Sequence, residues 1–204
     1  MASDNIFRMN KLIFATNNRH KVDEVRSVLQ NSFQILSLEE AGILIDIEEP
    51  HDTLQANASE KSRTIHQLTG KNCFSEDTGL EVDALQGEPG VKSARYAAGE
   101  NEFADNTEKL LFKLKNINNR KARFRTVISM ILGDQEYLFE GICTGQIAHE
   151  KSGTKGFGYD PVFIPDGSQV SFAEMSLEEK NRFSHRKKAM QQLIDFLNEK
   201  YGKN

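Results

Sequence analysis

The spacing of apolar residues predicts alternating strands and helices in the first third of the chain. A compact apolar run at 11–15, "KLIFA", predicts a buried strand that ends in a polar loop. Apolar residues recur at helical spacing over 22–29, and "FQILS" at 33–37 predicts a second strand. A second helical stripe covers 54–68, preceded by a capping box at 52–55. This order is typical of an α/β fold with a partly parallel sheet.

The middle of the chain has a different pattern. A helix is predicted over 103–117, and the long apolar stretch 122–148 predicts two or three strands with a hairpin turn at Gly133-Asp134. We interpret this antiparallel section as a second lobe. A further helix is expected to begin near Ser176, and an apolar stripe at 189–201 predicts a C-terminal helix. The sequence contains no repeat or low-complexity linker that would mark a domain boundary.

Composition narrows the function classes. The 204 residues include 26 Lys and Arg against 30 Asp and Glu, which gives a net charge of −4. This charge argues against a protein that binds nucleic acid through a large basic surface. Cys73 and Cys143 lie in apolar stretches without CxxC spacing, which favours a reducing, cytoplasmic location. We expect neither secretion nor a membrane span, because the N-terminus lacks an apolar leader and no run approaches about 18 apolar residues.

The segment "SEDTG" poses the main question. A short apolar run, "NCF", predicts a buried strand that ends in two adjacent carboxylates, Glu76 and Asp77, followed by a Thr-Gly turn. Adjacent carboxylates repel unless a cation lies beside them. Together with "IEEP" at 47–50, they form two separated acidic turns, and Mg²⁺ often takes only one or two carboxylates plus substrate phosphates. Without a metal we expect the Glu76-Asp77 pair to be strained and partly protonated; two ordinary acidic turns are the alternative.

Three other polar segments fit a nucleotide site. "ATNNRHK" at 15–21 either holds phosphates at a helix N-terminus or is a Thr/Asn cap with a solvated lysine. "GFGYDPVF" at 156–163 either brings Phe157 or Tyr159 against a flat ring or anchors a loop on the core. The basic segment at 178–190 is either a solvated helix end or a clamp for a polyphosphate. Because no P-loop, GxGxxG, HExxH or GxSxG motif occurs, these segments together favour a nucleoside triphosphate site of another kind.

In this order and over nearly the whole chain, the segments resemble the inosine triphosphate pyrophosphatase family, also called Ham1-like. The resemblance implies Mg²⁺-dependent hydrolysis of ITP, dITP and XTP to the nucleoside monophosphate and pyrophosphate, which cleanses the nucleotide pool. It also implies a homodimer.

The resemblance implies roles for individual residues. Asp77 would be the general base and a Mg²⁺ ligand, Glu49 the second ligand, and Glu76 a supporting acid. Asn17 and His20 stand where the family's phosphate loop often has glycine. The residues expected to bind substrate are Thr16, Asn17, Asn18, Lys21, Thr78, Phe157, Gly158, Tyr159, Asp160, Lys180, His185 and Arg186, with the first four on phosphates and Phe157 stacked on the base.

We therefore expect residues 1–204 to form one α/β domain, with two lobes around a long twisted mixed β-sheet, flanking helices and the active site in the cleft between the lobes. Three alternatives stay open. A Maf-like pyrophosphatase would lack the "GFGYDP" and "SHR" segments, and a nucleotide sensor would not need both acidic clusters. A nucleic-acid-binding module would have to rely on the basic segment despite the negative net charge.

Overall fold

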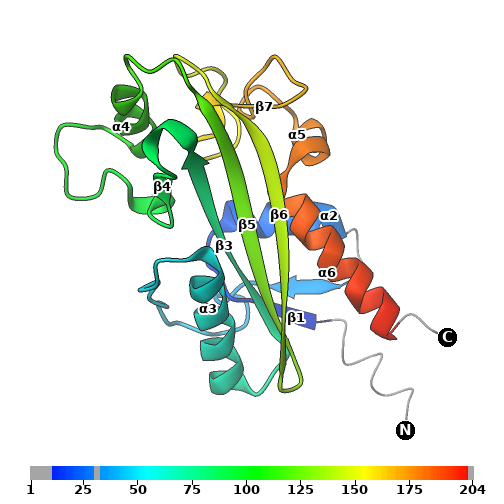
Figure 1. The fold of residues 1–204 in the computed structure, drawn as a ribbon. Helices are drawn as coiled ribbons and strands as arrows, with labels where there is room; N and C mark the ends of the chain where they lie inside the picture. The colour runs from blue at the N-terminus through cyan, green and yellow to red at the C-terminus, as the bar shows by residue number, and fades with distance from the viewer. Residues whose placement is uncertain (1–10, 30–32, 202–204) are drawn as a thin grey trace, which may run out of the picture. The chain divides into compact units, whose positions relative to one another are not determined.

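The computed structural model describes residues 11–29 and 33–201, so the expected absence of an N-terminal leader, a prediction about residues 1–10, lies outside the described residues. From β1 to β3 the elements alternate between strands and helices, as the apolar pattern predicts (Figure 1). In chain order they are β1 (Lys11–Phe14), α2 (Arg19–Leu29), β2 (Gln34–Leu36), α3 (Leu54–Thr69), β3 (Cys73–Val82), β4 (Pro89–Gly90), α4 (Asn106–Lys113), β5 (Lys121–Leu132), β6 (Gln135–Ile147), β7 (Phe163–Pro165), α5 (Leu177–Phe183) and α6 (His185–Tyr201).

The strands form a mixed sheet, which confirms the predicted α/β class. Its order is β2-β1-β3-β5-β6-β7, and β4 pairs with β3. Strand β1 runs parallel to β2 and β3, whereas β4 and β7 are antiparallel to their partners. The chain divides into two compact units, and β3, β5 and β6 contribute residues to both. Unit 1 comprises Met1–Asp77, Thr126–Gly141 and Arg186–Asn204, and unit 2 comprises Thr78–Arg125 and Ile142–His185.

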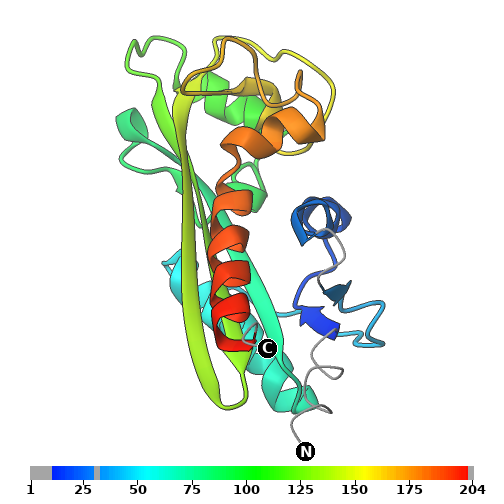
Figure 2. The same cartoon turned by 90° about the vertical axis from the view of Figure 1, so that its right-hand side faces the viewer.

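In unit 1 the sheet is covered by helices on both faces, because successive strand residues point to opposite sides. Leu12 and Phe14 pack in one buried cluster with residues of α2 and α6. Ile13 and Ala15 pack in another cluster with Ile65 of α3. Figure 2 shows α6 running beside the β5–β6 hairpin. Strands β1, β3 and β5 therefore carry side chains to an α2/α6 face and to an α3 face.

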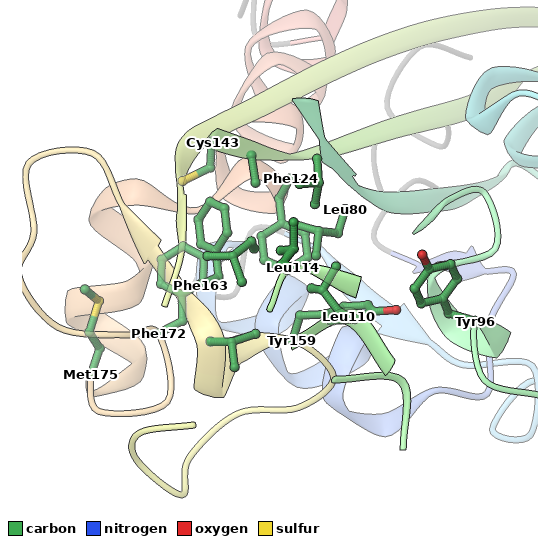
Figure 3. Packing of buried hydrophobic residues seen from close by; sticks show 14 residues of the cluster. Leu80, Tyr96, Leu110, Leu114, Phe124, Cys143, Tyr159, Phe163, Phe172 and Met175 are labelled. Atoms are coloured by element: carbon green, nitrogen blue, oxygen red, sulfur yellow. The ribbon is translucent and has the colours of Figure 1, made fainter. Parts of the chain in front are cut away.

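Unit 2 is built around aromatic rings. Phe124 of β5 lies 4.7 Å from Phe163 of β7, and Phe163 lies 5.2 Å from Phe172, measured between ring centroids. Figure 3 shows these rings together with Leu110 of α4 and Leu114, the residue that caps the C-terminus of that helix. Such packed rings stabilise a core beyond the area they bury.

Two predicted helix starts need correction, while others are confirmed. The side chain that caps α3 is Thr53, not Asp52, and it accepts the N–H of Ala56. The helix predicted over 103–117 is shorter, because Asp105 caps α4 and only 106–113 are helical. The predicted start near Ser176 is confirmed by a capping box with Glu179, and the hairpin turn at Gly133 is confirmed.

Among the described residues, no helix is long and apolar enough to cross a membrane.

The pairing of β6 with β7 requires glycine at position 145. A Cβ there would lie 2.3 Å from the Ile164 carbonyl oxygen and 2.9 Å from the Pro165 Cα. We expect Gly145→Ala to lower the free energy of unfolding by about 1–3 kcal/mol, because backbone atoms cannot move aside without separating the strands. Chemical denaturation measures this change. Gln146→Ala, an exposed neighbour on the same strand, should change it by less than about 0.5 kcal/mol, and equal losses would contradict the explanation.

Candidate active site

Glu76 and Asp77 lie in the middle of strand β3, not after its end. The predicted Thr-Gly turn is wrong, because β3 continues through Thr78 and Gly79 to Val82. Neighbouring residues of a strand point to opposite faces of the sheet. Glu76 therefore shares the α2/α6 face with Phe74, and Asp77 shares the α3 face with Cys73. The two carboxylates avoid each other through the geometry of the strand itself.

On the α2/α6 face, Glu76 is neutralised by two cations from distant parts of the sequence. Arg186 of α6 donates two hydrogen bonds to it, at 2.7 and 2.8 Å, and Lys21 of α2 lies 3.2 Å away. Glu24 of α2 accepts a further hydrogen bond from Arg186. Burial favours the neutral form of Glu76, but Arg186 and Lys21 outweigh it and hold the pKa of Glu76 well below its usual range. The expectation that this carboxyl is partly protonated without a metal is therefore wrong.

On the α3 face, Asp77 meets a different set of groups. Lys61 Nζ bonds Glu49 Oε1 at 2.5 Å and lies 3.4 Å from Asp77 Oδ1. The same ammonium donates to the backbone carbonyl of Glu76 at 2.7 Å. Asn57 Nδ2 reaches the other Asp77 oxygen at 3.3 Å. We call Glu49, Asn57, Lys61 and Asp77 the Asp77 site.

The pKa of Asp77 is raised, in contrast to that of Glu76. Burial is the largest cause, Lys61 opposes it, and the nearby carboxylate of Glu49 adds to it. A carboxylate whose pKa is raised holds a proton more tightly. This property suits a general base.

The Asp77 site has the ligand chemistry that Mg²⁺ prefers. Glu49 and Asp77 each bring a carboxylate oxygen to one point, the position of Lys61 Nζ. In the part of the chain that the structure describes, no three His, Cys, Asp or Glu side chains cluster as a complete metal site. Mg²⁺ usually takes one or two carboxylates and completes its shell with water and substrate phosphates. The residues present fit that cation, whereas a fully protein-ligated metal such as structural zinc would need more ligands.

The predicted phosphate loop is held by its own side chains. Thr16 Oγ1 accepts the N–H of Asn18 at 3.2 Å, and Asn18 Oδ1 accepts the N–H of Lys21 at 3.3 Å, as a cap at the start of α2 does. Asn17 Oδ1 accepts the N–H of Glu39 at 3.0 Å. The lysine of this loop is not simply solvated, since its ammonium meets Glu76. A role of these residues on phosphates stays a prediction.

In unit 2, the glycines of "GFGYD" allow an aspartate to lie against the backbone. Asp160 Oδ2 accepts the N–H of Phe157 at 2.9 Å, and a Cβ on Gly156, whose φ is +74°, would lie 2.0 Å from this oxygen. Phe157 is only half-buried, whereas Tyr159 is buried and donates its hydroxyl to the Ser93 carbonyl. Gly158 is exposed. Of these two aromatic residues, Phe157 is the more exposed, and its stacking on a base stays a prediction.

The basic segment divides between the two units. Lys180 of α5 is buried, donates to Asp160 Oδ2 at 2.6 Å and lies 5.2 Å from the centroid of the Phe157 ring. The His185 ring stacks on Phe124, with centroids 4.7 Å apart. Arg186, the next residue, belongs to unit 1 and bonds Glu76. Lys180 and His185 thus lie with unit 2. Contact of Lys180, His185 and Arg186 with a base stays a prediction.

Thr78 is half-buried and directly follows Asp77 on β3, and its expected contact with substrate also stays a prediction.

Residues 12–196 match the model of the Ham1 family. The chain belongs to the Ham1 family. The dITP/XTP pyrophosphatase of Porphyromonas gingivalis is 53% identical over 191 residues, covering 93% of this chain and 98% of the relative. That of Flavobacterium johnsoniae is 51% identical over 187 residues, covering 92% and 97%. Among solved structures, the Ham1 protein of Staphylococcus aureus matches with a TM-score of 0.82 at 38% identity, covering 93% of this chain and 99% of that one.

The sequence reasoning missed three residues of this Ham1 family member. Asn57 and Lys61 are four positions apart on α3, so they share one face of the helix and both reach Asp77. Glu24 follows Lys21 by three positions on α2 and bonds Arg186. The spacing of polar residues within otherwise buried helix faces is the signal that could have found them.

The ion pairs of Glu76 predict a large effect of Arg186 on stability. Its side chain is 2% exposed, so Arg186→Met leaves buried carboxylates without their main cation. We expect this variant to lower the free energy of unfolding by about 3–5 kcal/mol, measured by denaturant titration. Lys151→Met removes a half-exposed pair with Asp105, 2.6 Å apart, and should lower it by less than about 1 kcal/mol. Similar losses in both variants would show that the buried network adds little stability.

Proposed function

We propose that this chain hydrolyses dITP, XTP and ITP between the α- and β-phosphates, with Mg²⁺ as its cofactor, and so removes deaminated purines from the nucleotide pool. The observation that carries this proposal is the Asp77 site. There the carboxylates of Glu49 and Asp77 converge on Lys61, and Asp77 is buried and has a raised pKa. The relatives named dITP/XTP pyrophosphatase support it, because they are about half identical to this chain over nearly their whole length.

Asp77 would act as the general base. It takes a proton from a water molecule whose oxygen attacks the α-phosphorus, the bond from that phosphorus to the bridging oxygen breaks, and pyrophosphate leaves with the bonding electrons. The products are the nucleoside monophosphate and pyrophosphate. Lys61 holds the Asp77 and Glu49 carboxylates in place through its contacts at 3.4 and 2.5 Å. Such proton transfer contributes about 10²–10⁴-fold to a rate.

Mg²⁺ would be held by Glu49 and Asp77 together with phosphate oxygens and, when bound, would neutralise the charge of the triphosphate. Thr16, Asn17, Asn18 and Lys21 are the proposed contacts of the remaining phosphate oxygens. The start of α2 supports this, because the helix dipole and its backbone N–H groups favour an anion there.

The base would be read by the residues of unit 2. Phe157 offers a half-buried ring for stacking, and the Asp160–Lys180 pair fixes the loop that carries it. Hypoxanthine and xanthine carry an oxygen at position 6 where adenine carries an amine. A site that donates a hydrogen bond to that oxygen rejects adenine, because adenine would leave the buried donor unpaired.

We also propose a cellular location and an oligomeric state for this chain. We infer a cytoplasmic protein, since Cys73 and Cys143 are both buried and neither forms a disulfide. We propose a homodimer on the family resemblance, with no nucleic-acid or membrane partner.

The proposed function predicts a substrate pattern. Pyrophosphate release should be fast from dITP, XTP and ITP with Mg²⁺ and should stop when EDTA replaces the metal. Release from dATP and dTTP should be at least about 100-fold slower in kcat/KM, because a mismatched hydrogen-bonding edge leaves buried groups unpaired. Release from dGTP should also be slower, although guanine shares the oxygen at position 6 and has to be excluded at its 2-amino group. Equal turnover of all six nucleotides would contradict the base selectivity, and binding of dITP without turnover would leave a sensor.

The roles of the carboxylates predict different kinetic losses. Asp77→Asn should lower kcat by about 10²–10⁴-fold, because it removes the base. Glu49→Gln should raise the Mg²⁺ concentration for half-maximal activity by at least about tenfold, because a ligand loses its charge. The neighbouring Glu48→Gln is a matched control, since Glu48 is exposed, and it should behave as the unmodified enzyme does. Equal Mg²⁺ requirements in Glu49→Gln and Glu48→Gln would exclude Glu49 as a ligand.

A further inference from the structure

Asn57 is a fully buried primary amide in the first turn of α3, with 0% of its surface exposed. A buried amide destabilises a fold unless its oxygen and both N–H groups find partners. All three described hydrogen bonds of the Asn57 side chain lead to Asp77 or to the segment that carries Glu49.

The first two hydrogen bonds clamp the backbone of His51. Asn57 Oδ1 accepts the His51 N–H at 2.9 Å, and Asn57 Nδ2 donates to the His51 carbonyl at 3.0 Å. This reciprocal pair imitates the bonding between two strands and fixes both the position and the direction of the chain at residue 51. Only Pro50 separates the clamped residue from Glu49, and proline restricts the backbone further. The clamp therefore limits where the Glu49 carboxylate can lie.

The third hydrogen bond runs from Nδ2 to Asp77 Oδ2 at 3.3 Å. Lys61, one turn further along α3, contacts the other oxygen of Asp77 and also bonds Glu49. The two oxygens of Asp77 thus have separate partners on one helix. A single buried side chain, Asn57, contacts both the base and the segment of the second carboxylate.

We propose that Asn57 is a positioning residue that sets the separation and orientation of Glu49 and Asp77 and thereby tunes the affinity of the site for its divalent cation. The inference rests on the proposed function, since it takes these two carboxylates as the ligands. Asn57 is not itself a ligand in this proposal, because its side chain is fully buried and its oxygen already accepts the His51 N–H. It acts on the cation through the carboxylates, as groups that orient metal ligands do.

Two variants test the role, with thermal unfolding in EDTA confirming that each is folded at the assay temperature. Asn57→Ala removes the amide, and Asn57→Leu removes its hydrogen bonds while keeping a side chain of similar shape. The main readout involves no turnover: calorimetry measures binding of an α,β-methylene analogue of dITP, which cannot be cleaved, across a series of Mg²⁺ concentrations. Both variants should raise the Mg²⁺ concentration for half-maximal binding by about 10–100-fold. With dITP at saturating Mg²⁺, KM should change by less than about threefold.

Thr53→Ala is the matched control, because Thr53 caps the same helix through the Ala56 N–H. It should lower the unfolding temperature while leaving the Mg²⁺ dependence of analogue binding unchanged. A Mg²⁺ midpoint in Asn57→Leu and Asn57→Ala equal to that of Thr53→Ala would overturn the positioning role and leave the proposed function intact. Analogue binding by the unmodified protein that does not depend on Mg²⁺ would overturn both.

Discussion

The alternation of side chains along β3 is the constraint on which the rest of the site depends. Because neighbouring strand residues face opposite sides of a sheet, Glu76 and Asp77 are adjacent in sequence yet lie in separate environments. Each environment is supplied by different helices. Glu76 meets α2 and α6, while Asp77 meets α3. A turn at this position, as the residue types favour, would have placed both carboxylates in one solvated patch with similar pKa values.

The two faces of strand β3 carry different sets of charged groups. On the α2/α6 face, two carboxylates meet Arg186 and Lys21 in a buried network that holds Glu76 ionised. Such a network contributes less to stability than its close contacts suggest, since desolvation offsets much of the attraction, but removal of one member is destabilising. Through Glu76, this network ties the backbone of β3 to α2 and α6.

Local pattern predicted much of the fold but could not predict these contacts. The apolar runs that became β1 and the β5–β6 hairpin, and the capping box at Ser176, are signals contained within a few residues. The centre of β3 was mispredicted because Glu, Asp and Gly are poor strand formers, and only tertiary packing overrides that preference. Arg186 is 110 positions from Glu76, so no window of sequence could pair them. Lys21 and Arg186 were therefore assigned to substrate from the resemblance, without the carboxylate that both of them meet.

Asp77 and Glu49 share Lys61 unequally, and this difference bears on the proposed role of Asp77 as the base. An ammonium between two carboxylates cannot bond both equally well, and here Nζ lies 2.5 Å from Glu49 but 3.4 Å from Asp77. Asp77 is also the more buried carboxylate of the two, with 7% of its side chain exposed against 24% for Glu49. Burial is the largest cause that raises the pKa of Asp77, and the nearby carboxylate of Glu49 adds to it, whereas Lys61 opposes both. Glu49 is more closely paired with Lys61 and more exposed, which suits the role of cation ligand that we propose for it. The unequal distances from one lysine thus place two otherwise similar acids in different environments, which supports the proposed role of Asp77 as the base.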